Sequence, residues 1–195
     1  MLTLDLLEEL KTGWARQRAP VVDHLRPGLS PERIDELTAP LGLRLPVEAR
    51  TWWEWHDGVD VTLGIHSELG PSVPFLPLGN AAELCRLLRE QAGKTWGDQA
   101  DHWWRPGWFP ITERSRGDQM GLRVEEGAPT PIFWADSHDY DADGLANPKV
   151  DSFGTMVTWW IEALDSGAWR YDAGAGRWER RSELLPSERE VSRLV

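Results

Sequence analysis

A single α+β domain is the fold class that the sequence predicts, with helices packed against a mainly antiparallel sheet. Helix-type periodicity fills the first third of the 195-residue chain, several short β-type segments follow, and one more helix and a hairpin end it. This order differs from the repeating βα pattern of a parallel sheet. The chain also has no internal repeat or clear linker, and its length and 41% hydrophobic content suit one domain with a substantial core. We therefore expect residues 1–195 to form one domain.

Two helices are expected at the start of the chain. Leucines and Trp14 recur on one face of a helix over residues 2–18, which must end before Pro20. The next helix starts at Ser30-Pro31, because serine caps a helix N-terminus well and proline suits the first helical position.

The pattern then changes from helix to strand and back. A third helix begins near Pro46 and ends at the Asp57-Gly58 turn. Apolar residues alternate from Val59 to Ile65, which predicts a half-buried strand. Asn80, with Glu83 three residues later, is similar to a capping box and predicts the start of another helix.

Short strands dominate the middle of the chain. We expect Gly93 to end the preceding helix, and residues 94–108, which have no clean period, to form a long loop with at most one helical turn. Strands are then predicted at 108–113, 120–126 and 131–136, separated by turn residues.

One helix and one hairpin are predicted near the C-terminus. Ser152 caps a helix whose apolar residues share one face. Residues 168–180 have two β-type runs around a glycine-rich turn, which predicts a hairpin. The tail from Ser182 is polar and is expected to be frayed or to form a short helix.

Acidity and tryptophan content are the two unusual features of the composition. The chain has 32 Asp plus Glu against 21 Lys plus Arg, a formal charge of -11, and 13 Trp. Residues 51–169 hold 19 acidic and 8 basic side chains, and thus the whole net charge, together with most of the Trp residues. A nucleic-acid binder needs a basic face, so this class is excluded. A negative region attracts cationic partners, although solubility alone also explains acidity.

Adjacent tryptophans suggest an exposed aromatic surface. Neighbouring side chains on a helix point about 100° apart, so a narrow buried stripe does not hold both rings of a pair. Tryptophan is enriched among residues that dominate protein interfaces, while core packing is the alternative for each ring. We expect Trp55, Trp103 and Trp104 to be exposed beside acidic residues on a protein-binding surface. Its candidate residues are Trp55, Asp57, Asp60, Trp103, Trp104, Asp136, Asp139, Asp141 and Asp143.

No metal or cofactor is predicted. Asp139, Asp141, Asp143 and Gly144 are similar to the first half of a calcium loop, but the twelfth position is Val150 instead of glutamate. A solvated acidic turn is therefore expected. No two histidines have the HxxxH or HxH spacing of a local zinc site.

The sequence also lacks the common catalytic motifs. It has no nucleophile elbow, P-loop or dinucleotide fingerprint, so we expect no enzyme activity. His56 is explained as a histidine at a helix C-terminus, and Cys85, the single cysteine, as a small buried residue of a helix. The Trp and acidic residues leave a carbohydrate-binding or hydrolysing protein as an alternative.

A cytoplasmic location is expected. The N-terminus has no basic region of the kind that opens a secretory signal. No stretch approaches the ~18 apolar residues of a membrane span, so membrane binding is not expected.

Residues 28–58 resemble the opening signature of the SUKH superfamily. That signature has a helix starting at Ser-Pro, an LG turn, a Leu-Pro pair that opens a second helix, and an aromatic stretch ending in Asp-Gly. The matching residues are Ser30-Pro31, Leu41-Gly42, Leu45-Pro46, Trp52 to Trp55 and Asp57-Gly58. The resemblance implies an α+β core over residues 28–169, with the helix over 2–18 and the hairpin and tail over 168–195 as additions.

The resemblance also implies a function. The superfamily has no known catalytic activity; many bacterial members are similar to immunity proteins that bind and neutralise a cognate toxin, often a nuclease, and fungal relatives act in the regulation of cell-wall synthesis. Together with the acidity and the Trp residues, this favours an immunity protein that blocks a basic toxin domain by direct binding. A regulatory or scaffold domain of the cell-wall type is the alternative, and the oligomeric state is left open.

Overall fold

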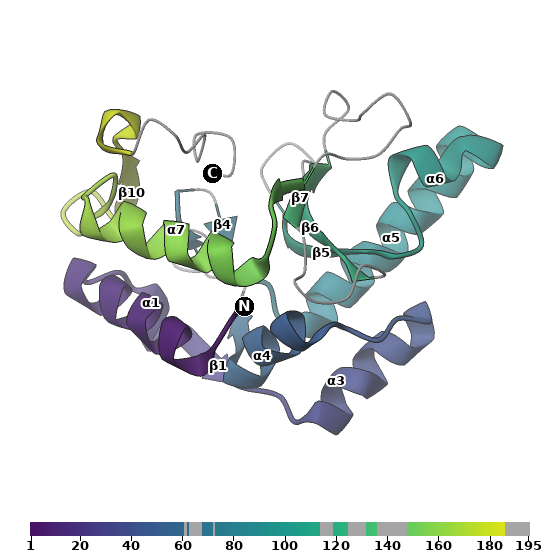
Figure 1. Cartoon of the computed structure of the whole chain (residues 1–195), viewed down its shortest axis with the longest axis horizontal. Helices are drawn as coiled ribbons and strands as arrows, with labels where there is room; N and C mark the ends of the chain where they lie inside the picture. The colour runs from purple at the N-terminus through teal and green to yellow at the C-terminus, as the bar shows by residue number, and fades with distance from the viewer. Residues whose placement is uncertain are drawn as a thin grey trace.

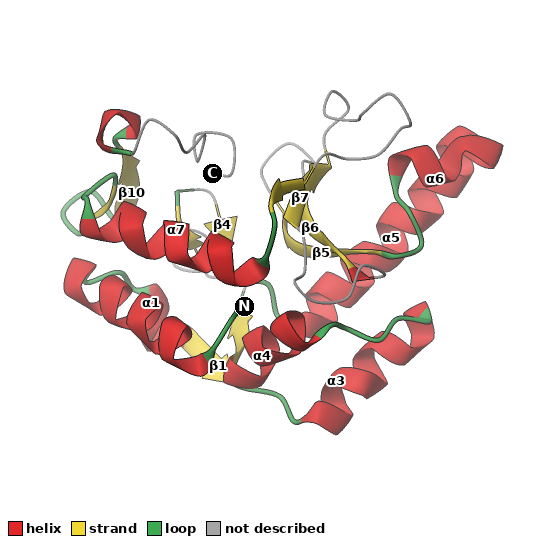
Figure 2. Ribbon diagram, viewed as in Figure 1, coloured by secondary structure: helices red, strands yellow, loops and turns green. Residues whose placement is uncertain are grey.

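The computed structural model describes residues 1–60, 62, 68–71, 73–113, 119–124, 132–135 and 148–185, and at 99, 102, 103, 113, 119, 132–135, 148 and 149 it describes the backbone alone. Figure 1 labels the elements in chain order, and Figure 2 distinguishes helices from strands. The helices are α1 (Leu4–Gln17), α2 (Val21–His24), α3 (Pro31–Thr38), α4 (Val47–Trp55), α5 (Leu78–Trp96), α6 (Ala100–Trp103) and α7 (Phe153–Asp165), with 3-10 turns η1 (Ala39–Leu41), η3 (Gly97–Gln99) and η5 (Ser182–Leu184).

All strand pairs in the described residues are antiparallel, which confirms the predicted α+β class. A four-stranded sheet has the order β5-β6-β7-β8, and three smaller sheets pair β1 with β2, β3 with β4, and β9 with β10. The strands are β1 (Leu25–Pro27), β2 (His56–Val59), β3 (Glu68–Gly70), β4 (Val73–Pro74), β5 (Trp108–Glu113), β6 (Gln119–Arg123), β7 (Ile132–Ala135), β8 (Pro148–Val150), β9 (Trp169–Asp172) and β10 (Arg177–Arg180).

Two predicted helix starts are confirmed by their caps. The Ser30 hydroxyl accepts the backbone N–H of Arg33 at 3.2 Å, and the Ser152 hydroxyl accepts that of Thr155 at 3.0 Å. Each bond satisfies one of the N–H groups that a helix leaves without an intrahelical partner. The strands at β5, β6 and β7 and the C-terminal hairpin are also where the sequence predicts them.

Helix α5 differs from its predicted boundaries at both ends. It begins at Leu78, and its N-cap position is Pro77, so the capping box predicted at Asn80 and Glu83 does not form. It also continues through Gly93 to Trp96, and η3 and α6 follow directly. The prediction of a long loop over 94–108 is therefore wrong, because a single glycine lowers helix stability without ending a helix.

The predicted strand over 59–65 is wrong at the described positions beyond its start. Strand β2 ends at Val59 and pairs with β1. Asp60 lies outside any strand and Thr62 has a 3-10 conformation, because the Asp60 carboxylate bonds locally to Thr62 instead of leaving its backbone to a sheet partner. Val61 and residues 63–67 lie outside the described part of the chain.

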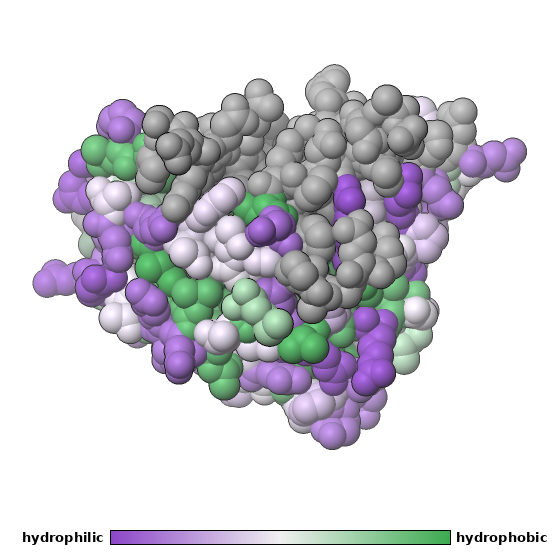
Figure 3. Space-filling view, in the orientation of Figure 1, coloured by the Kyte–Doolittle hydropathy of each residue, from purple (hydrophilic) through white to green (hydrophobic). Residues whose placement is uncertain are grey.

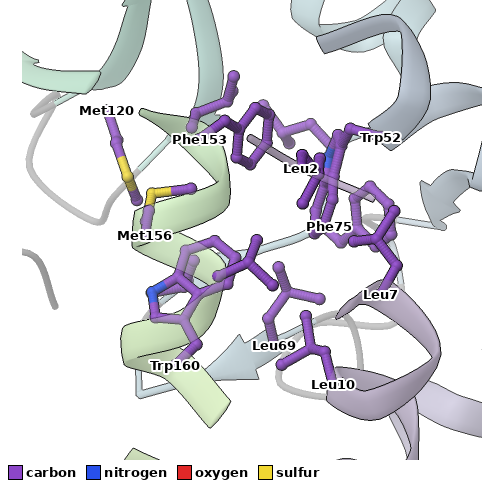
Figure 4. Packing of buried hydrophobic residues seen from close by; sticks show 14 of the residues in the cluster. Leu2, Leu7, Leu10, Trp52, Leu69, Phe75, Met120, Phe153, Met156 and Trp160 are labelled. Carbon is purple, nitrogen blue, oxygen red and sulfur yellow. The ribbon is translucent and has the colours of Figure 1, made fainter. Parts of the chain in front are cut away.

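Helices α1, α4 and α7 enclose most of the main core. Figure 4 shows leucines of α1 facing aromatic side chains of α4 and α7. The Trp52 ring centroid lies 4.3 Å from that of Phe75 and 5.1 Å from that of Phe153. Burying large aromatic surfaces in this way supplies the main favourable term in folding.

Helix α1 packs along α7 although the two are far apart in the sequence (Figure 1). Hydrophobic atoms follow the seam between them, and hydrophilic atoms cover much of the neighbouring surface (Figure 3). Arg16 pairs with Asp165 at 2.5 Å across this seam, and the Trp14 indole N–H donates to the Leu69 carbonyl at 2.9 Å.

The C-terminal hairpin has one aromatic and one charged face. Trp169, Tyr171 and Trp178 are buried, and the last two rings meet edge to face at 5.5 Å. On the other face Arg177 lies opposite Asp172, an arrangement that favours the register of an antiparallel pair. The predicted hairpin thus extends the main core instead of lying apart from it.

Candidate partner-binding surface

Three of the four predicted partner residues whose side chains the structure describes are buried. Trp55 and Trp104 have 9% and 4% of their surface exposed, so the expectation that they are exposed is wrong. Trp104 packs edge-on against Trp108, with 5.7 Å between ring centroids. The side chain of Trp103 lies outside the described part of the structure.

Helix α4 is covered on several sides, which explains why its tryptophans are all buried. Trp52 faces α7, Trp53 faces β5, and Trp55 faces α1. The Trp55 indole N–H donates to the Glu8 carboxylate at 2.6 Å. The expectation of one narrow buried stripe was therefore wrong, because this short helix packs against α1, α7 and β5 at the same time.

Asp57 is a buried structural residue and not part of a partner surface. Its carboxylate accepts a hydrogen bond of 2.8 Å from the backbone N–H of Leu78, at the start of α5. The same carboxylate forms an ion pair with Arg26 at 3.0 Å. Burial raises the pKa of Asp57, while the Leu78 bond and Arg26 act in the opposite direction. Gly58 follows with φ of +68°, and the backbone of Pro77 leaves no space for a side chain there.

Asp60 is the one predicted acidic candidate that the described residues place on the surface. It accepts the backbone N–H and hydroxyl of Thr62 at 2.9 and 2.7 Å, and these bonds lower the pKa of Asp60. The other four acidic candidates lie outside the described part of the chain, as does the segment similar to a calcium loop. They are Asp136, Asp139, Asp141 and Asp143. Their part in partner binding stays a prediction.

His56 is held by two neighbours at the C-terminal end of α4. Its Nδ1 lies 2.8 Å from the Arg26 carbonyl oxygen, and its Nε2 lies 3.4 Å from the Lys11 ammonium. Since a carbonyl only accepts and an ammonium only donates, the neutral Nδ1–H tautomer fits both contacts. Burial lowers the pKa of His56, and the Lys11 charge acts in the same direction.

The described residues offer no metal centre and no reactive thiol. No three His, Cys, Asp or Glu side chains in this part of the chain gather in a way that could hold a metal ion. Cys85 is fully buried, as predicted, its Sγ lies 3.4 Å from the Trp108 carbonyl oxygen, and burial raises the pKa of the thiol. None of the helices described has the length and apolar character needed to span a bilayer.

An exposed tryptophan does exist, at a position that the sequence analysis missed. Of the eleven Trp side chains described, nine are buried and Trp159 is half-buried, whereas Trp96 is 41% exposed. Its neighbours in the sequence, Lys94 and Asp98, are polar and exposed. A polar context alone does not identify the exposed ring, since the buried Trp104 and Trp178 also lie among polar residues.

Trp96 belongs to a projecting arm, defined here as the α5–α6 arm (residues 92–105). In Figure 1 the end of α5 and α6 lie at the edge of the molecule farthest from α1. A small hydrophobic cluster, separate from the main core, joins Ala92, Trp104 and Trp108 and supports the arm. Gly97, with φ of +52°, ends α5 immediately after Trp96, and the exposed Asp98 and Asp101 follow. The arm therefore presents the exposed Trp96 ring close in sequence to two exposed carboxylates.

Comparison with known proteins gives one relative and one family. The alpha-1,4-glucan:maltose-1-phosphate maltosyltransferase of Mycolicibacterium smegmatis is 24% identical over 196 residues, which cover 95% of this chain and 23% of that protein. The chain thus spans about a quarter of the length of this curated relative. The model of the SMI1 / KNR4 family (SUKH-1) matches residues 28–159, about two thirds of the chain, and includes the signature over 28–58. The resemblance seen in the sequence is confirmed, and the chain belongs to the SMI1/KNR4 (SUKH-1) family.

Proposed function

We propose that this protein binds another protein and blocks it by occlusion, as an immunity protein does when it neutralises a toxin. Membership of a family without known catalytic activity supports a binding role. The observation that carries the proposal is the exposure of Trp96 on the α5–α6 arm, because nearly all other described Trp rings are buried. A large exposed aromatic side chain is typical of the anchors that dominate protein interfaces.

Charge supports a basic partner. The formal charge of the chain is -11, and on the arm Asp98 and Asp101 are exposed close in sequence to Trp96. Negative charge around an aromatic anchor speeds association with a positively charged surface and disfavours acidic partners. A toxin that acts on nucleic acid has such a surface, because it must bind phosphates.

Co-expression tests the proposal directly. The protein is produced together with a toxin encoded next to its gene, and growth and complex formation are measured. We expect the protein to restore growth and to form a stable complex with the toxin. Failure of both would contradict the immunity role. A pull-down that recovers cell-wall synthesis or signalling proteins and no toxin would instead favour the regulatory or scaffold function.

A pair of variants tests the surface. Trp96→Ala removes the exposed ring of the arm, and Leu87→Ala removes an exposed apolar side chain of the same helix, nine residues away and on the opposite side. We expect Trp96→Ala to weaken toxin binding about 30-fold or more, as for an interface hot spot, and Leu87→Ala to leave the affinity close to that of the wild type. Equal affinities for both variants would place the interface elsewhere.

Carbohydrate binding is a second candidate, and the relative from Mycolicibacterium smegmatis favours it. That protein is named for an activity on an alpha-1,4-glucan, and its similarity extends over nearly the whole of this chain. An exposed Trp ring such as Trp96 is also suited to stacking on a sugar. Titration with malto-oligosaccharides, followed by Trp fluorescence, should then give saturable quenching that Trp96→Ala abolishes. A flat titration would exclude this candidate for these sugars.

A further inference from the structure

Two side chains, one in β5 and one in α7, are among those whose buried polar groups have no hydrogen-bond partner in the described residues. They are the hydroxyl of Thr112 in β5 and the indole N–H of Trp160 in α7, and each residue is 2% exposed. Buried polar groups in folded proteins almost always pair with a protein group or with ordered water. Both of these groups therefore require a partner that the described side chains do not supply.

The two residues line the same small cavity. Its other described walls are apolar and include Trp52 of α4, Met120 of β6 and Phe153 of α7. The short strands β3 and β4 also contribute to the lining. Figure 4 shows these three side chains and Trp160 around this part of the core, with the indole nitrogen pointing away from Leu10. The volume open to the centre of a water-sized sphere in this cavity is about 10 Å³. This is about the volume that a cavity needs to hold one water molecule.

A β-bulge explains how a hydroxyl comes to face this apolar region. In the pairing of β5 with β6, Pro110 lies opposite Gly121 and Thr112 opposite Met120, so Ile111 is an extra residue on β5. Neighbouring residues of a regular strand point to opposite faces, yet Ile111 and Thr112 both line the cavity. Bulges redirect side chains in this way.

We infer that this cavity is a specific site for a single water molecule. The Trp160 N–H donates to this water, and the Thr112 hydroxyl pairs with it, so that both buried groups are satisfied. No charged side chain is among the described residues that line the cavity, so these residues give an ion no counter-charge, and the space is too small for an organic ligand. The water thereby connects β5 to α7. In the described structure the Thr112 hydroxyl and the Trp160 N–H do not bond to each other directly.

Water-to-protein NOE spectroscopy on the ¹⁵N-labelled protein tests the site, because a buried water gives a long-lived cross-peak to the indole H–Nε1 of Trp160. We expect this cross-peak in the wild type and in Thr112→Ser, which keeps the hydroxyl, and its loss in Thr112→Val. We also expect the Tm of Thr112→Val to fall by about 2–4 °C. Without the Thr112 hydroxyl the water is no longer held in place, and the Trp160 N–H is left buried without a partner.

The sign of the Tm change separates the alternatives. If the cavity is dry, Thr112→Val removes an unpaired hydroxyl, and the Tm rises. Thr38→Val is the matched control, because Thr38 is also fully buried but bonds to the Ile34 carbonyl at 3.1 Å; this variant should keep the Trp160 cross-peak. Absence of the cross-peak in the wild type, its survival in Thr112→Val, or a higher Tm for that variant would each overturn the inference.

Discussion

Glu48 is a carboxylate with none of its surface exposed, and it joins three helices. Its Oε1 accepts the N–H of Leu2, just before α1, at 2.7 Å and the N–H of Gly154, in the first turn of α7, at 3.1 Å. A side chain at Gly154 would lie 2.5 Å from the Met1 carbonyl carbon, so the glycine allows this close approach. A negative charge at the start of a helix is also favoured by the helix dipole.

Removing this carboxylate should strongly destabilise the fold. Glu48→Ala leaves two buried N–H groups unpaired, and we expect it to lower the free energy of unfolding by about 3 kcal/mol. Glu48→Gln keeps an acceptor oxygen and should lose less. Urea denaturation measures both, with the exposed Glu9→Ala as a control that should stay within about 0.5 kcal/mol of the wild type. Similar values for Glu48→Ala and Glu9→Ala would contradict the role of Glu48.

His56 should make stability depend on pH in a defined window. Because burial lowers its pKa in the folded state, the unfolded chain binds the proton more readily. The stabilisation is complete above pH 6.5, the ordinary value, and is lost as the pH falls through the lower folded pKa. Protonation also places a second cation beside Lys11, while Glu8 partly offsets it.

A variant that cannot titrate isolates this effect. His56→Asn keeps a donor for the Arg26 carbonyl but carries no ionisable group. We expect the stability of the wild type relative to His56→Asn to be constant above about pH 7 and to decrease below pH 6.5, as measured by denaturation at a series of pH values. A difference that stays constant down to pH 5 would show that His56 does not titrate differently in the folded state.

At the scale of single elements, helix α5 receives its N-terminal cap from a residue of strand β2. Asp57 of β2 accepts the Leu78 N–H, whereas Asn80 lies within the first turn of the helix. We expect Asp57→Ala to cost at least about 1–2 kcal/mol, the usual value of a cap, and Asn80→Ala to be neutral or slightly stabilising, because alanine has the higher helix propensity. Thermal unfolding of both variants checks this; a larger loss for Asn80→Ala would restore the predicted capping box.

The end of α5 gives a second contrast between similar residues. Gly93 lies inside the helix, and a methyl group there would meet no atom within 4 Å, so Gly93→Ala should stabilise the protein by about 0.5–1 kcal/mol. Gly97 has a positive φ, so Gly97→Ala should be destabilising. Chemical denaturation of the pair measures both signs. Loss of stability in Gly93→Ala would mean that the helix ends there, as the sequence suggested.

These elements show which parts of the fold can be predicted from sequence. Local signals succeeded: Ser30 and Ser152 cap helices, and alternating segments form strands, because each depends on a few neighbouring residues. Signals that depend on distant partners failed. Nothing near Leu78 in the sequence indicates that Asp57 will cap it, and nothing in α4 shows that Trp55 will be covered by α1. The expected exposure of Trp55 and Trp104 was wrong for the same reason, because exposure is decided by tertiary packing.

At the scale of the whole molecule, the family match and the folded unit have different limits. The family model covers residues 28–159, yet the main core includes side chains on both sides of it. Helix α1 contributes Leu7, Leu10 and Trp14, all fully buried, and the hairpin contributes Trp169 and Trp178. We therefore propose that α1, the family region and the hairpin form one cooperative unit.

Truncation to residues 28–166, which keeps the family region and the whole of α7, tests this proposal. The fragment exposes the faces of α4 and α7 that α1 and the hairpin cover, and a core that loses several large side chains at once loses more than the 5–15 kcal/mol by which a typical domain is stable. We expect the fragment to lack the near-UV circular dichroism of packed Trp side chains and to unfold without a cooperative transition. Within the full chain, Trp14→Ala should cost about 3–5 kcal/mol. If the fragment unfolds cooperatively at the midpoint of the full chain, or if Trp14→Ala is neutral, then α1 is an accessory to the domain and not part of its core.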